Sequence, residues 1–304
     1  MSNLKETVNK VRIEGILAET NIDYKTYDDK NGNKVEAIAG EFQVLVRTNV
    51  DGVPKDLMIP VRVFSNKLTG AGKPNPAYAS IEKVKNEFVS IAAAGGEEKA
   101  TKVRITNGKL SVNEYPDATG RIVSYPRITA SFISEANGNF NPEATFDIVM
   151  VVDSIREVVD KDGVPMDPEQ LSVHGSIVQY NGSVDCIELV ANLPSTITGI
   201  RDYWNVGDTV RVGGKLNFTY SVVEVQEQVA FGEATKKQTR RVSELVIVNG
   251  TPAFEGDAAI DPNELEIGKK ERLARLENLK SKENSKPKQT PAPSDSYSTD
   301  DLGF

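Results

Sequence analysis

Residues 77–94, AYASIEKVKNEFVSIAAA, form a stretch with helical periodicity inside a chain of mostly strand-like sequence. Its large apolar residues recur at intervals of three and four positions, at Ile81, Val84, Phe88 and Ile91. This spacing predicts one amphipathic helix, because such residues share one helical face. Two glycines, Gly95 and Gly96, follow directly and predict the end of that helix.

Strand-like sequence lies on both sides of the helix. Three segments with frequent alternation of apolar and polar residues precede it and three follow it: 11–17, 41–47, 57–64, 102–105, 109–112 and 121–133. This alternation predicts half-buried strands. Three strands, a helix and further strands is the element order of an oligonucleotide-binding (OB) barrel, a small sheet closed on itself. Another small β-barrel or an α+β domain fits the same order.

A second set of strand-like segments predicts a second barrel: 146–152, 171–178, 184–190, 209–216 and 242–248. Residues 197–204 between them predict a short helix or loop. We therefore expect a mainly β protein with two OB-fold-like antiparallel β-barrels, a charged C-terminal helix and a disordered acidic tail. The predicted bounds are 1–136 and 137–254 for the barrels, 255–282 for the helix and 283–304 for the tail.

The two predicted barrels share short sequence echoes. Residues 103–105 and 108–110 (VRI, GKL) match residues 210–212 and 214–216 (VRV, GKL), and residues 13–15 (IEG) match residues 173–175 (VHG). A period above 100 residues is too long for a solenoid and fits two related barrels.

Composition limits the classes of function. The 304 residues include 44 acidic and 36 basic side chains, so the net charge is −8. A nucleic-acid surface must then be a focused basic patch. The N-terminus carries no secretion signal pattern and no apolar run is long enough to span a membrane. The single cysteine, Cys186, has no disulfide partner within the chain, which favours a cytoplasmic protein, in the host cytoplasm if it is phage-encoded.

The sequence offers no catalytic constellation. The one histidine, His174, lies in a predicted strand, where a structural role is the more common one, and Cys186 has no second histidine to activate it. Phosphate-loop, dinucleotide-binding and paired metal-ligand motifs are missing from the sequence. We therefore predict that the protein is not an enzyme and uses no cofactor or metal.

Cations and aromatic rings on predicted strands and loops are the residue types that single-strand binding needs, because cations contact phosphates and rings stack on bases. The candidates for binding single-stranded DNA are Tyr24, Lys25, Tyr27, Lys34, Arg47, Arg62, Phe64, Lys67, Lys73, Arg104, Tyr115, Arg121, Tyr125, Arg127, Tyr203, Trp204, Arg211, Lys215, Arg240 and Arg241.

Many aromatic residues must fill the barrels instead. Phe42 and Phe132 alternate with polar neighbours and are predicted in the core. Four tyrosines near turns or strand ends are predicted to be exposed: Tyr24, Tyr27, Tyr115 and Tyr125. For Trp204 two interpretations stay open, stacking on a base or sealing the second barrel.

The chain ends in a polar tract, residues 281–299, followed by Asp300, Asp301, Leu302, Gly303 and Phe304. Such a tract cannot bury enough apolar surface to order itself. Its acidic tip with a terminal Phe suits capture by a basic, apolar pocket on another protein. A plain solvated acidic tail is the simpler interpretation.

Strand-rich units with cations and aromatics, a proline-punctuated linker and this tip together resemble bacterial and phage single-stranded DNA-binding proteins. In that family the tip is a run of Asp, two further residues and a terminal Phe, and Asp300, Asp301 and Phe304 match it. Bacterial members usually carry one barrel per chain, so two barrels suggest a phage-encoded member and a monomer or dimer.

The resemblance implies a sequence-independent single-stranded DNA-binding protein in DNA replication, recombination or repair. The tip, Asp300 to Phe304, would recruit replication and recombination proteins and compete with DNA for the basic groove. A β-rich phage structural or protein-interaction component without nucleic-acid binding is the alternative.

Overall fold

The computed structural model describes residues 3–284 except 51–52, 118, 137 and 228–233. Most of the predicted tail, including the tip from Asp300 to Phe304, lies outside the described residues. The described part is mainly β, with a mixed sheet whose strand order is β10-β11-β9-β8-β7-β1-β2-β3-β5-β4-β6. None of its helices is long and apolar enough to cross a membrane.

Strand pairing closes a first ring from strands in the N-terminal half of the chain. It consists of β1 (Asn9–Asp28), β2 (Lys34–Val50), β3 (Val53–Asn66), β4 (Lys102–Pro116) and β5 (Ile122–Thr129). The ring runs β1-β2-β3-β5-β4 and returns to β1, because β1 pairs with both β2 and β4. The short β6 (Ser134–Glu135) pairs with β4.

A second ring repeats this order. It consists of β7 (Glu143–Glu157), β8 (Leu171–Val178), β9 (Val184–Ala191), β10 (Thr209–Glu227) and β11 (Ala234–Gly250). The ring runs β7-β8-β9-β11-β10 and returns to β7. The first strands of the two rings, β1 and β7, pair with each other and join the rings.

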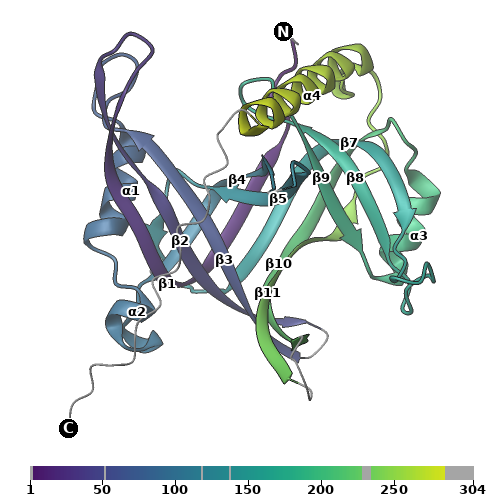
Figure 1. Cartoon of the computed structure of the whole chain (residues 1–304), viewed down its shortest axis with the longest axis horizontal. Coiled ribbons are helices and arrows are strands. Elements are labelled where there is room, and N and C mark those ends of the chain that lie inside the picture. The colour runs from purple at the N-terminus through teal and green to yellow at the C-terminus, as the bar shows by residue number, and fades with distance from the viewer. Residues whose placement is uncertain (1–2, 51–52, 118, 137, 228–233, 285–304) are drawn as a thin grey trace.

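Helices follow equivalent strands in the two rings. α1 (Pro76–Asn86), α2 (Ile91–Ala94) and the 3-10 turn η1 (Glu97–Lys99) lie between β3 and β4, and α3 (Pro194–Tyr203) lies between β9 and β10. After the second ring come the turn η2 (Gly256–Ala258) and α4 (Pro262–Asn284). Figure 1 shows α1 and α3 on opposite sides of the molecule and α4 along the top of the view.

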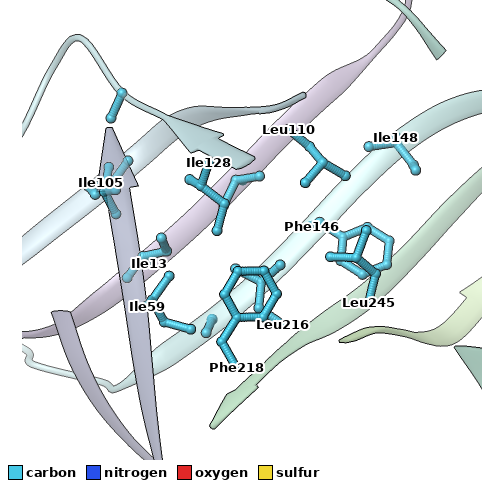
Figure 2. Packing of buried hydrophobic residues seen from close by; sticks show 14 of the residues in the cluster. Ile13, Ile59, Ile105, Leu110, Ile128, Phe146, Ile148, Leu216, Phe218 and Leu245 are labelled. Carbon is cyan, nitrogen blue, oxygen red and sulfur yellow. The ribbon is translucent and has the colours of Figure 1, made fainter. Parts of the chain in front are cut away.

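The two rings share one hydrophobic core. Inward-facing residues of the first ring, such as Ile13 and Ile59, belong to the same buried cluster as Phe146 and Leu216 of the second. Figure 2 shows the ring of Phe218 with Ile59 on one side and Phe146 on the other. Burial of such side chains is the main stabilising contribution to the fold.

Three expectations about the elements need correction. The strand pairing is not wholly antiparallel as expected, since β3 pairs with β5 and β9 with β11 in parallel. Residues 77–94 form two helices, because Ser90 caps α2 and Thr101 hydrogen-bonds to the backbone of Val89 between them. Phe132 was predicted in the core and is 59% exposed, since it lies in the loop after β5.

The sequence echoes are only partly structural. Residues 103–105 and 210–212 lie on β4 and β10, which hold the same position in the two rings. Residues 13–15 lie on β1, whereas residues 173–175 lie on β8, the second strand of its ring. The first echo therefore reflects the repeated ring, and the second does not.

Candidate nucleic-acid interface

The outer face of β3, β5 and β4 carries several of the predicted binding residues. Val61, Val63 and Ile128 point into the core, so the residues that alternate with them lie on the opposite face. The pairing of Arg62 with Thr129, and of Ser111 with Arg127, extends this face across the three strands. We call it the first-ring face, defined by Arg62, Phe64, Tyr115, Tyr125 and Arg127.

Arg62 and Arg127 place two guanidinium groups near each other on this face. Among the described residues, neither has a carboxylate within ion-pair distance. Arg127 is half-buried and donates a hydrogen bond from Nη2 to Asn113 Oδ1. Burial, and then the charge of Arg62, lowers the pKa of Arg127, and Glu41 and Asp185 oppose that shift. An anion bound here would offset the repulsion between the two cations.

Aromatic rings flank this pair of cations. Tyr115 and Tyr125 stack with ring centroids 6.1 Å apart and are 43% and 49% exposed, so the prediction of exposure is confirmed. Phe64 is exposed beside Arg62 on β3, and its centroid lies 6.4 Å from that of Tyr27. Exposed rings within reach of cations are the elements of a single-strand binding surface.

A second group of predicted residues lies on the β1–β2 hairpin and near α1. Tyr24 and Tyr27 are exposed as predicted, but their hydroxyls donate to Glu82 Oε1 and Asn66 Oδ1. Lys67 pairs with Glu36 at 2.5 Å, and Lys25 lies 3.9 Å from Asp23. Lys34 and Lys73 are further exposed cations of this group, and Arg121 is an exposed cation in the turn between β4 and β5.

Three predicted arginines already have carboxylate partners. Arg47 binds Asp56 and Glu97. Arg104 binds Glu14, and Arg211 binds Asp147. A phosphate would have to compete with these carboxylates for the guanidinium groups. The three arginines are therefore not free cations and are not part of the first-ring face.

The second ring offers fewer of the predicted groups. The prediction that Trp204 binds DNA is wrong, since this residue is only 6% exposed and its Nε1 donates to Thr251 O at 2.8 Å. It seals the second ring and cannot stack on a base. Tyr203 on α3 and Lys215 on β10 are exposed. Arg240 and Arg241 lie on β11, and their side chains are outside the described part.

A groove of about 460 Å³ lies between the rings. Tyr125 borders it from the first ring, His174 and Glu188 from β8 and β9, Glu244 from β11 and Arg272 from α4. Cys186 also lines it and is half-buried, and burial raises the pKa of its thiol. We call this the inter-ring groove.

Sequence reasoning assigned His174 to a structural role, found no group that activates Cys186, and did not single out Glu188 or Glu244. Alternation along β8 and β9 was an available signal. The buried Val173, Ile187 and Leu189 alternate with these polar positions, which places them on the outer face. This face forms one wall of a groove only because residues of the first ring and of α4, which are distant in sequence, lie opposite it. Within the described residues, no group of three or more His, Cys, Asp or Glu side chains could hold a metal ion.

Comparisons with known proteins place the chain in a family. The model of the YorF family matches residues 7–284, and the chain belongs to this family. A comparison with curated proteins gives no match.

Among solved structures, the wild-type single-stranded DNA binding protein from Thermus aquaticus is similar, with 12% identity and a TM-score of 0.48, over 85% of this chain and 98% of that one. A deletion mutant of the same protein gives 12% identity and a TM-score of 0.47, over 84% and 98%.

Proposed function

We propose that the protein binds single-stranded DNA without sequence preference, through the first-ring face. The observation that carries this proposal is the pair Arg62 and Arg127, two neighbouring guanidinium groups without a carboxylate partner among the described residues. Such a pair is costly without an anion and suits a phosphate. The exposed rings of Phe64, Tyr115 and Tyr125 on the same face suit unstacked bases.

The strand order of each ring supports the assignment of OB-type barrels. In each ring the first strand pairs with the second and fourth, and the third pairs in parallel with the fifth. A helix lies between the third and fourth strands, as expected for an OB barrel. We take residues 1–136 and 137–254 as the two barrels, 255–282 as the charged helix and 283–304 as the tail.

The proposed biological role is protection of single strands in phage DNA replication, recombination or repair, in the host cytoplasm and without catalysis. The sequence of the tip, Asp300 to Phe304, supports recruitment of replication and recombination proteins. Deleting those five residues is expected to abolish partner binding while DNA affinity stays equal or rises. A complete loss of DNA binding on deletion would contradict this division of roles.

Fluorescence anisotropy of a labelled oligo-dT tests the proposal. The double variant Arg62→Gln/Arg127→Gln should bind at least tenfold more weakly at low salt, because two phosphate contacts are lost. The matched control Lys99→Gln/Lys161→Gln removes two exposed cations that have no ion-pair partner in the described part, one on η1 and one between β7 and β8. If neither the wild type nor the control variant bound the oligonucleotide saturably, DNA binding would be refuted and the alternative of a structural component would be favoured.

A further inference from the structure

The inter-ring groove differs in charge from the first-ring face. Two carboxylates, Glu188 and Glu244, line it. Among the described residues that line it, the one guanidinium is that of Arg272, which is held by Glu114, a residue that is 4% exposed in its side chain. A phosphate is disfavoured in such a lining, because it would meet two negative charges and a neutralised cation. The groove therefore does not suit the backbone of a nucleic acid.

The two carboxylates are oriented with one oxygen open. Glu188 Oε1 accepts a hydrogen bond from Ser172 Oγ at 2.7 Å and lies 3.9 Å from His174 Nε2. Glu244 Oε2 accepts from Asn217 Nδ2 at 2.6 Å. Within the described part of the chain, the remaining oxygen of each carboxylate has no hydrogen-bond donor. Carboxylates held in this way, each with a free acceptor oxygen, can accept hydrogen bonds from the donor groups of a ligand.

The groove also lies close to the proposed phosphate contacts. Tyr125 borders it and is two residues before Arg127 on β5, a separation of about 7 Å along a strand. A base attached to a phosphate at Arg127 can therefore reach the groove. Its volume of about 460 Å³ is within the range of small-molecule sites.

We propose that the inter-ring groove is a subsite for a nucleobase that carries an amino group, and that Glu188 and Glu244 accept from that group. Cytosine presents its N4 amino group as a donor where thymine presents the O4 acceptor. A carboxylate accepts from the first and repels the second. The inference rests on the proposed function, and it gives an otherwise non-specific protein a preference for cytosine over thymine.

Competition with unlabelled dC20 and dT20 against one labelled oligonucleotide tests this subsite. We expect dC20 to bind about threefold to tenfold more tightly than dT20. This ratio is near the lower end of the discrimination that a base contact gives, because the groove is open to solvent. In the variant Glu188→Gln/Glu244→Gln the ratio should fall to about one, while dT20 affinity stays equal or rises. The control Glu98→Gln removes an exposed carboxylate on η1 and should keep the wild-type ratio.

Cys186 gives a second readout, because it is the only cysteine of the chain and lines the same groove. Saturating dC20 should slow its alkylation by iodoacetamide more than saturating dT20, as measured by mass spectrometry. Equal affinities in the wild type, or a preference that survives the double substitution, would overturn the subsite while leaving the proposed function intact. Failure of both oligonucleotides to bind would refute the proposed function itself.

Discussion

Arg104 donates two hydrogen bonds to Glu14, from Nε to Oε2 at 2.6 Å and from Nη2 to Oε1 at 3.0 Å. Arg211 makes the same kind of contact with Asp147, at 2.7 and 2.5 Å. Each pair joins the fourth strand of a ring to its first strand. The repeated arginine therefore holds the same place in each ring, at the contact between the fourth strand and the first.

The Arg104 pair should contribute more to stability than the Arg211 pair. Glu14 is 7% exposed in its side chain and Asp147 is 38% exposed, so water screens the second pair more. We expect Arg104→Met to lower the urea midpoint of unfolding more than Arg211→Met does. Equal midpoints for the two variants would show that burial of the carboxylate does not decide the contribution.

Glu14 should also make stability depend on pH. Hydrogen bonds from Arg104 and the backbone of Asn141 lower the pKa of Glu14 against the opposing effect of burial. Its contribution is then full above the unfolded pKa, about 4.5, and is lost as pH falls through the folded value. Urea unfolding between pH 3 and 7 should show a smaller acid loss for Glu14→Gln than for wild type. An unchanged slope would contradict this role.

These pairs show what the sequence could predict and what it could not. Alternation placed Val61, Val63 and Ile128 in strands, and hydrophobic spacing located α1, because both signals are local. Arg104 and Arg211 were wrongly expected to be free for DNA, because their partners Glu14 and Asp147 lie 90 and 64 residues away along the chain and no local pattern reveals them.

The aromatic residues show the same difference between local and distant signals. Exposure of Tyr115 and Tyr125 was predictable from nearby turns. Burial of Trp204 depends on Thr251 and Gly250, which only the closed second ring brings close.

Stacking on the first-ring face predicts a large effect of Tyr125→Ala on DNA affinity. Loss of one stacked base is expected to cost about 1–3 kcal/mol, read as a weaker Kd for oligo-dT at constant salt. Tyr180→Ala is the matched control, because Tyr180 is 87% exposed in the β8–β9 turn, away from the first-ring face. Similar losses for the two variants would indicate that tyrosines act without regard to this face.

Arg62 and Arg127 should each add to the salt dependence of binding. Each phosphate contact to a single strand contributes about 0.7 to the slope of log K against log salt concentration. We expect Arg62→Gln and Arg127→Gln each to reduce the slope by that amount, and the double variant by about twice as much. Titrations at four salt concentrations give the slopes, and a slope unchanged in the double variant would exclude both residues from phosphate contact.

Close backbone approach makes Gly40 less replaceable than Gly175. A Cβ at Gly40 would lie 2.1 Å from Asn21 O and 2.6 Å from Ile22 Cα, so two paired strands would have to separate. At Gly175 the nearest atom is Met150 Sδ at 2.3 Å, on a flexible side chain that can move. We expect Gly40→Ala to cost about 3 kcal/mol and Gly175→Ala about 1 kcal/mol. Thermal unfolding of the two variants compares them, and the reverse order would show that the strands can adjust at Gly40.

Glu114 is expected to hold α4 against the two rings. It accepts hydrogen bonds from Arg272 and Arg275 of α4, and Arg275 also lies 3.7 Å from Asp185 of β9. Lys269 adds a contact to Asp153 of β7 at 2.6 Å. α4 therefore contacts a strand of the first ring and two strands of the second through charged side chains.

Glu114→Gln should release α4 because Arg272 would keep its buried charge without a carboxylate. Loss of one partner of such a pair costs about 3 kcal/mol. Hydrogen exchange by mass spectrometry should then show faster exchange across residues 262–284, with α1 unchanged. Glu98→Gln serves as the control, since that carboxylate is exposed and lies on η1. Unchanged protection of α4 in Glu114→Gln would mean that the apolar contacts of Leu265 and Leu276, both buried, are sufficient to hold the helix.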